Sequence, residues 1–149
     1  MTVSFEKASV AEMDPVRLYA ILQLRVDVFV VEQQAAYAEL DGRDVEPPAR
    51  LYWAEEDGAV LATLRVLTET DGARIGRVAT ASTARGRGLA AELMRRAIAD
   101  YAEETIVLDA QQHLEAWYQG FGFARSGEVF VEDGIPHIPM TRAAGKTAL

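Results

Sequence analysis

The sequence predicts an α/β fold in which helices flank a central, mixed but mostly antiparallel sheet of about six to seven strands. Several short segments alternate apolar and polar residues as half-buried strands do, and two longer segments repeat apolar residues at helical spacing. Asp-Gly pairs separate some of the short segments, and such pairs favour tight turns between antiparallel strands. The chain of 149 residues is long enough for one domain. We expect that domain to span residues 1–142, followed by a disordered tail over 143–149.

The composition excludes several classes of protein. The chain has no cysteine, which removes disulfides, thiolate metal sites and cysteine nucleophiles from consideration. Its formal net charge of -8 argues against nucleic-acid binding, which depends on Lys and Arg neutralising phosphates. No His/Asp cluster has the spacing of metal ligands, so no metal is expected. No apolar run is long enough to cross a bilayer and the first residues do not resemble a signal peptide, so we expect a cytoplasmic protein without membrane contact.

The first third of the chain predicts a strand, a helix and a long loop. Residues 3–9 alternate as a strand does, and residues 13–33 follow as a helix with Asp14 as its N-cap and Pro15 at its first position. The apolar residues of this helix that keep the helical period are Leu18, Ile21, Leu22 and Val26. Residues 33–50 lose all periodicity and collect turn residues. Loops of this length in small domains are often functional.

The middle of the chain predicts three antiparallel strands and a second helix. Turns at Asp57-Gly58 and Asp71-Gly72 divide residues 51–80 into the strands. The helix begins near residue 88 and buries one face on the sheet. The apolar residues on that face are Leu89, Ala90, Leu93, Met94, Ala97, Ile98 and Tyr101.

The last third of the chain predicts a strand, a short helix and a final hairpin. Residues 104–110 form a short apolar strand, and residues 111–121 carry the pattern of a helix. The hairpin over residues 124–142 turns at Asp133-Gly134. The whole order, with hairpins at both ends and helices between the middle strands, is typical of a mixed sheet.

Charge is distributed unevenly along the chain. Residues 27–57 hold nine acids and two bases, whereas residues 85–96 hold four arginines and one acid. Such a pattern suits a protein that holds an anionic cofactor beside a cationic acceptor, although ordinary surface variation explains it equally well.

The basic segment, Arg85-Gly-Arg-Gly-Leu-Ala90, coincides with the start of the second helix. A helix N-terminus presents unpaired N–H groups and a partial positive charge, so it binds phosphate readily. The segment lacks the Gly-Lys-Ser/Thr of a P-loop and the glycine spacing of a dinucleotide fingerprint. Another phosphate-bearing ligand is therefore expected, with Arg85 and Arg87 near it and Arg95 and Arg96 on the solvated face of the helix.

Two motifs resemble the signatures of the GNAT acetyltransferase superfamily. Arg85-x-x-Gly88-x-Ala90 is similar to its cofactor signature, and Trp117-Tyr-Gln-Gly-Phe-Gly-Phe123 to its aromatic-Tyr-x-x-x-Gly-Phe element. Further stretches between Leu18 and Met140 resemble the ElaA-type branch. This chain departs from that branch at Ala35-Ala36, where Cys-Pro is usual, and at Trp117, where phenylalanine is usual.

The resemblance implies a GNAT-type fold and acetyl-coenzyme A as co-substrate. It implies that backbone amides at the helix start cradle the pyrophosphate, that the strand before it pairs with the pantetheine arm, and that an amide there polarises the thioester carbonyl. The donor-site residues so implied are Val78, Ala79, Thr80, Arg85, Gly86, Arg87, Gly88, Leu89 and Ala90.

The resemblance also assigns Tyr118 as the acid that protonates the departing thiolate; the alternative is a core tyrosine whose hydroxyl bonds to the backbone. The base is open among four residues. Glu32, at the end of the first helix, is the first choice, and Asp109, His113 and His137 are the others. Asp109 could instead cap the helix that follows it, and each histidine could be an ordinary surface residue.

Acceptor recognition is expected around the first helix and the acidic loop. Arg25 could hold a substrate carboxylate, although pairing with Glu32 or another structural role is the stronger expectation. The loop acids, which include Asp41 and Asp44, favour a cationic amine. The predicted acceptor-binding residues are Arg25, Phe29, Gln33, Tyr37, Asp41 and His137.

The sequence therefore predicts an N-acetyltransferase that moves acetyl directly from acetyl-coenzyme A to a primary amine of unknown identity. Two alternatives stay open: a non-catalytic acyl-coenzyme A sensor, and an interaction module whose acidic loop binds a basic partner. Formation of a homodimer is also left open.

Overall fold

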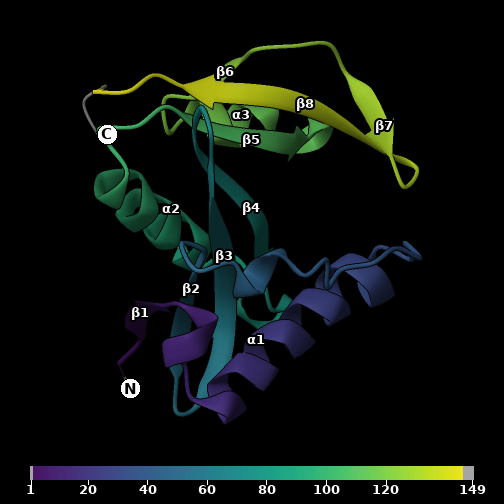
Figure 1. Cartoon of the computed structure of the whole chain (residues 1–149). Helices are drawn as coiled ribbons and strands as arrows, with labels where there is room; N and C mark the ends of the chain where they lie inside the picture. Colours follow the sequence, from purple (N-terminus) through teal and green to yellow (C-terminus); the bar gives the residue numbers. More distant parts are fainter. Residues whose placement is uncertain (1, 146–149) are drawn as a thin grey trace.

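One mixed sheet of eight strands runs through the computed structural model, which describes residues 2–145 (Figure 1). Its order is β1-β2-β3-β4-β5-β8-β6, with β7 also paired to β8, and only β4 and β5 run parallel. This confirms the predicted mixed, mostly antiparallel α/β sheet. The strands are β1 Ser4–Ala8, β2 Arg50–Glu56, β3 Ala59–Glu69, β4 Gly72–Thr80, β5 Ile106–Gln111, β6 Ala124–Arg125, β7 Phe130–Glu132 and β8 Ile135–Arg142.

Three α-helices cover the two faces of this sheet: α1 (Pro15–Val26), α2 (Leu89–Asp100) and α3 (Glu115–Gln119). Leu93, Met94, Ala97 and Ile98 of α2 and Tyr118 of α3 pack on one face with apolar residues of β2, β3, β5 and β8. The first helix covers the opposite face, where Ile21 packs against Leu51 and Trp53. Single helical turns occur at Val10–Glu12, Arg43–Val45, Ser82–Ala84 and Gln112–Leu114.

The first helix begins as predicted but changes its winding before the predicted end. Asp14 caps it by accepting a hydrogen bond from the Arg17 amide at 3.3 Å, and Pro15 is its first residue. Residues Asp27–Glu32 then form a wider π-helical turn. This segment holds three valines, and β-branched side chains crowd a regular α-helix. Such turns are rare and concentrate at functional sites.

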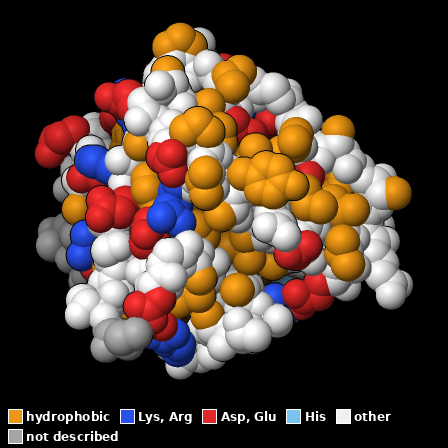
Figure 2. All heavy atoms as spheres, turned by 90° about the horizontal axis from the view of Figure 1, so that it is seen from below, with side chains coloured by type: hydrophobic (Ala, Val, Ile, Leu, Met, Phe, Trp, Pro, Cys, Tyr) orange, Lys and Arg blue, Asp and Glu red, His pale blue; other side chains and the backbone are white. Residues whose placement is uncertain are grey.

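The outer face of α1 is unusually apolar. Val16 and Tyr19 of α1, and Val31 of the π turn that continues it, are each more than 60% exposed. Figure 2 shows hydrophobic side chains gathered over one half of the underside, with most charged side chains on the other half. Because apolar residues also lie on the exposed side of the helix, its sequence alone does not reveal which face packs on the sheet.

Strand β4 contains a β-bulge, that is, one extra residue relative to its partner β3. Thr63 pairs with Ala79 and Arg65 with Gly76, so two residues of β4, Arg77 and Val78, lie opposite one residue of β3. Arg77 has a φ of +52°, in the left-handed region. A bulge of this kind bends the strand and increases its twist. Pairing of β4 with β5 is confined to the two residue pairs at its start, and the two ribbons diverge from there (Figure 1).

The predicted tail lies partly beyond the described residues 2–145. Residues 143–145 are described, and the Gly145 amide donates a hydrogen bond to the carbonyl of Ala102 at 2.7 Å. The prediction for 146–149 falls outside the part of the chain that the structure describes.

The turn before β4 requires glycine at position 72. Gly72 has a φ of +140°, and a Cβ there would collide with the carbonyl oxygen of Thr105. We predict that Gly72→Ala lowers the free energy of unfolding by about 3 kcal/mol, from overpacking plus left-handed strain. Urea denaturation measures this loss. Gly58→Ala is the control, because Gly58 also has a positive φ, +81°, but a Cβ there would meet open space. This variant should lose only the part of the unfolding free energy that comes from backbone strain. Equal losses in the two variants would show that the contact with Thr105 does not matter.

Candidate functional site

A cleft of about 670 Å³ opens where β4 and β5 diverge. Its walls come from β3, β4, β5, the start of α2, α3 and the turn before it, the β7–β8 hairpin and the π turn with the loop after it. Residues predicted for the donor site, the acceptor site and the proton transfers meet in this one cleft. Those that line it are Phe29, Glu32, Gln33, Tyr37, Val78, Ala79, Thr80, Arg85, Ala90, Asp109, His113, Tyr118 and His137.

The start of α2 has the form expected of an anion cradle. Gly88 is the N-cap residue, with a φ of +74° and no side chain to satisfy the helix amides. A Cβ on Gly86 or Gly88 would meet open space, so the backbone is accessible from outside. The first amides of a helix have no partner inside it. This turn therefore fits a phosphate group, although Gly86, Arg87, Gly88 and Leu89 lie outside the cleft proper.

The two arginines of this turn are both engaged by carboxylates. Arg85 forms a bidentate pair with Glu32 at 2.6 and 2.7 Å, and Arg87 contacts Glu56 at 3.1 Å. Hydrogen bonds from Arg85 lower the pKa of the Glu32 carboxyl. Because both pairs are exposed, they are weak and could exchange for a phosphate. On α2 itself, Arg95 and Arg96 are exposed and pair with Glu92, as expected for a solvated face.

Tyr118, the predicted acid, lines the cleft and is buried. Its ring makes edge contacts with Trp117 and Phe123 at centroid distances of 4.9 and 6.4 Å, which fix its orientation. Within residues 2–145 the structure gives its hydroxyl no protein hydrogen-bond partner, so the alternative of a backbone-bonded core tyrosine lacks support. Burial raises the pKa of Tyr118, and the hydroxyl therefore stays protonated at neutral pH.

The four candidate bases have different surroundings. Glu32 is held by Arg85, and Asp109 accepts a hydrogen bond from Arg74 at 3.2 Å. Asp109 does not cap the following helical turn, whose N-cap residue is Gln111. His113 is exposed at the rim of the cleft. His137 is half-buried, and its Nδ1 lies 2.8 Å from the carbonyl oxygen of Ile135.

Arg25 is fully buried, and its partners differ from the predicted one. Its guanidinium contacts Glu39 at 2.7 Å and Asp44 at 2.6 Å, both in the loop after the π turn. The predicted pairing with Glu32 is wrong, because the π turn carries Glu32 toward Arg85 instead. Arg25 also does not line the cleft. It ties the loop to α1 and is not positioned to hold a substrate carboxylate.

Two further arginines complete this ion network. Arg65 pairs with Asp41 at 2.9 Å, and Arg77, at the β4 bulge, contacts Glu39 at 2.9 Å and Asp41 at 3.2 Å. Burial alone would raise the pKa of Asp41, but its hydrogen bonds from Arg65 and the Arg43 amide lower it to about 2. Three guanidiniums thus face the three carboxylates of Glu39, Asp41 and Asp44. Arginines of the protein itself thus neutralise these loop acids. The charge argument for a cationic amine at this loop therefore no longer holds.

Two hydrogen-bonded pairs next to the network involve residues that line the cleft. The Tyr37 hydroxyl donates a hydrogen bond to Glu39, and burial, together with this bond, raises the pKa of Tyr37. The amides of Gln33 and Gln111 exchange hydrogen bonds at 3.2 and 3.3 Å. This second contact bridges the π-turn side of the cleft and the end of β5, which are 78 residues apart in sequence.

The sequence does not indicate that several other residues line the cleft. Arg65, Arg74 and Arg77 line the cleft. Strand periodicity does not say that Arg65 and Arg77 pair with acids of a distant loop. It also does not say that Arg74 pairs with Glu69 and Asp109 of the adjacent strands. Gln111 could have been found only by knowing that β5 ends at the cleft.

The described residues, 2–145, contain no group of three or more His, Asp or Glu side chains arranged to hold a metal ion. No helix in the same range is long and apolar enough to cross a membrane.

Comparisons with known proteins give one consistent result. The family model described as the acetyltransferase (GNAT) domain matches residues 18–144. A UPF0039 protein of Mycobacterium tuberculosis is 44% identical over 147 residues, which cover 95% of this chain and 94% of that protein.

Two solved structures are also similar over nearly their whole length. The structure of an acyl-CoA N-acyltransferase from Pseudomonas aeruginosa is 41% identical with a TM-score of 0.90, covering 95% of this chain and 100% of that one. The structure of Escherichia coli ElaA is 34% identical with a TM-score of 0.89, covering 95% and 99%.

The buried position of Arg25 predicts a large loss on substitution. Arg25→Met keeps the volume but leaves Glu39 and Asp44 without their buried partner, so the free energy of unfolding should fall by about 3–5 kcal/mol. Chemical denaturation at neutral pH gives the value. The control, Arg95→Met, removes an exposed pair with Glu92 and should cost under about 1 kcal/mol. Similar losses in both variants would show that the network does not hold the loop.

Proposed function

Because this chain belongs to the GNAT acetyltransferase family, we propose that it is an N-acyltransferase that moves acetyl from acetyl-coenzyme A to a primary amine. The observation that carries the proposal is the meeting of an open helix N-terminus, an unpaired strand edge and a protonated tyrosine at one cleft. The name of the similar Pseudomonas aeruginosa protein, an acyl-CoA N-acyltransferase, supports the same reaction class. A cytoplasmic location and a homodimer stay predictions of the sequence.

The donor half of the proposed site uses backbone groups. Amides of Arg87, Gly88, Leu89 and Ala90 hold the pyrophosphate, since the helix N-terminus offers both N–H groups and a partial positive charge. Beyond its pairs with β5, the edge of β4 from Gly76 to Thr80 has backbone groups available for the pantetheine amides. Bound acetyl-coenzyme A supplies an activated acyl group as a thioester, and an amide near Val78 stabilises negative charge on its carbonyl oxygen.

Tyr118 acts as the general acid in this scheme. Its hydroxyl donates a proton to the sulfur as the carbon–sulfur bond breaks. The raised pKa of Tyr118 makes it a weaker acid than free tyrosine. The same apolar surroundings also raise the basicity of the departing thiolate, which reduces the difference in pKa between the two groups.

The proposal is tested by following the release of free coenzyme A from acetyl-coenzyme A. The acceptors are putrescine, spermidine, lysine, glycinamide and a peptide with a free N-terminus. Steady release with at least one amine, with the acetylated product seen by mass spectrometry, is the expected result. Tight acetyl-coenzyme A binding with no release by any acceptor would favour a sensor, and no binding would favour an interaction module.

The acid role of Tyr118 predicts a loss confined to turnover. Tyr118→Phe should lower kcat by about 10²–10⁴-fold and leave acetyl-coenzyme A affinity unchanged, because only a proton donor is removed. Stopped-flow kinetics and calorimetry separate the two effects. Tyr19→Phe, on the exposed face of α1, is the control for loss of a phenol hydroxyl. Unchanged turnover in Tyr118→Phe would remove the hydroxyl from the mechanism.

The proposed phosphate-binding turn at Gly88 predicts a loss of cofactor affinity. Gly88→Glu places bulk and negative charge beside the helix amides, so acetyl-coenzyme A binding should become undetectable by calorimetry. Gly58→Glu is the matched control, since that glycine also has a positive φ and open space but lies in the distant β2–β3 turn. Tight binding by Gly88→Glu would show that the phosphates bind elsewhere.

A further inference from the structure

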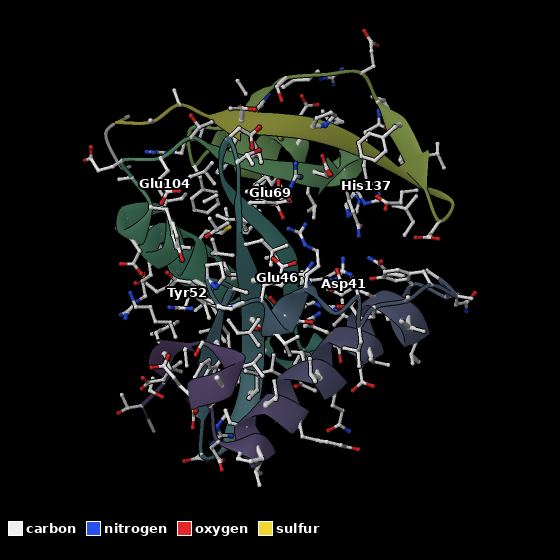
Figure 3. The ribbon with its side chains drawn as sticks, viewed as in Figure 1. Asp41, Glu46, Tyr52, Glu69, Glu104 and His137 are labelled. Atoms are coloured by element: carbon white, nitrogen blue, oxygen red, sulfur yellow. The ribbon has the colours of Figure 1, made fainter. Side chains whose placement is uncertain are left out.

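The ring of His137 is held by a stacking contact with Phe130 and by a hydrogen bond to the carbonyl of Ile135. It lies on β8, between Gln111 of β5 and Phe130 of β7 in the strand register. Its ring stacks on Phe130 with centroids 5.6 Å apart and planes 21° apart. In Figure 3 the labelled His137 lies on the β8 side of the cleft, across from the loop that carries Asp41. Two contacts thus fix a ring that lines the cleft.

One of these contacts fixes the position of the proton on the ring. The nitrogen Nδ1 lies 2.8 Å from the carbonyl oxygen of Ile135. Because a carbonyl oxygen can only accept, Nδ1 must carry the hydrogen. In the neutral ring Nε2 then holds the lone pair, and the ring is oriented to accept a proton there. A backbone carbonyl that fixes a histidine tautomer in this way is a common device for preparing an imidazole for chemistry.

The competing groups are less suited to accept a proton. The Glu32 carboxylate is engaged at both oxygens by Arg85, and its lowered pKa makes it a weaker base. Asp109 is held by Arg74. The structure gives His113 no hydrogen bond or ring contact within residues 2–145, so nothing selects its tautomer.

We propose that His137 is the general base of the acyl transfer, an assignment that rests on the proposed function. Nε2 accepts the proton that the acceptor nitrogen loses as its bond to the acyl carbon forms. The carbon–sulfur bond breaks, and Tyr118 donates its hydroxyl proton to the sulfur. The His137 imidazolium then releases its proton to solvent, and the Tyr118 oxygen takes one up, so both groups return to their starting states. Phe130 is a positioning residue that holds the ring.

Other titratable and charged groups line the same cleft and also affect the pH dependence of the rate. They come from the π turn and the loop after it, β3, β4, the turn before α2, β5, the turn before α3, α3 and the β7–β8 hairpin. They are Glu32, Tyr37, Arg65, Arg74, Arg77, Arg85, Asp109, His113, Tyr118, Glu132 and Asp133. Of these, Glu32, Asp109 and His113 are the rival bases, so variants of all three belong in the experiment.

The kinetic experiment uses the full chain with acetyl-coenzyme A and two acceptors, putrescine and the less basic amine glycinamide. His137→Asn retains an N–H that can donate to Ile135 but has no basic nitrogen. We expect it to lower kcat by about 10²–10⁴-fold with putrescine and less with glycinamide, to change the pH profile, and to leave acetyl-coenzyme A affinity unchanged. Val131→Thr, an exposed change on β7, should keep the wild-type profile.

Several kinetic outcomes would overturn the assignment. His137→Asn that keeps wild-type turnover and pH profile would do so. Transfer of the entire effect to Glu32→Gln, His113→Asn or Asp109→Asn would do so as well. Phe130→Leu should lower kcat more than it changes KM, and a purely structural role would instead lower stability with kcat intact. A wild-type chain that is inactive with every amine would contradict the proposed function itself.

A second measurement needs no acceptor. The chain has only two histidines, so ¹⁵N NMR of the imidazoles, assigned with His137→Asn, reads each tautomer directly. At a pH where the ring is neutral, we expect the hydrogen of His137 on Nδ1. A hydrogen on Nε2 would overturn the proposal whatever the activity of the protein.

Discussion

The extra residue in β4 is the constraint on which the rest of the site depends. A regular parallel pair would continue to bond along its length and would leave no space between β4 and β5. The left-handed backbone at Arg77 ends that regularity, and strain of this kind persists only where the surroundings enforce it. Here the enforcing contacts are those of the Arg77 side chain with Glu39 and Asp41. The ion network that holds the acceptor-side loop thus also holds the strand that opens the cleft.

The charge pattern of the sequence pairs an acidic segment with a basic one, but the structure gives the two segments different roles. On the proposed donor side, backbone amides at the start of α2 are the elements we propose to bind the anion, and the nearby arginines already have partners. On the other side, the acids of the loop serve the fold, because Arg25, Arg65 and Arg77 neutralise them. In the proposed function, acceptor selection would then depend on other groups that line the cleft, such as His137 and the bridge between Gln33 and Gln111.

The sequence predicted what depends on local patterns and missed what depends on distant contacts. The Asp-Gly turns, the cap at Asp14 and the glycines before α2 follow from backbone preferences, and the structure contains all of them. The π turn was not predicted, because three valines still fit a helical period. The partner of Arg25 was predicted wrongly, because Glu32 is nearer in sequence while Glu39 and Asp44 approach through the fold. The tautomer of His137 depends on the hydrogen bond between its Nδ1 and the carbonyl of Ile135, which the spacing of residues in the sequence does not predict.

The most direct test of the central claim, that the diverging strands and the start of α2 form the acyl-coenzyme A site, is a titration of ¹⁵N-labelled protein with acetyl-coenzyme A. Backbone amide shifts report where the ligand binds, residue by residue. The account predicts that the largest changes fall on residues 76–80 and 87–90, with smaller ones at Tyr118. Changes confined to other surfaces, such as the apolar face of α1, or no changes at saturating ligand, would contradict it.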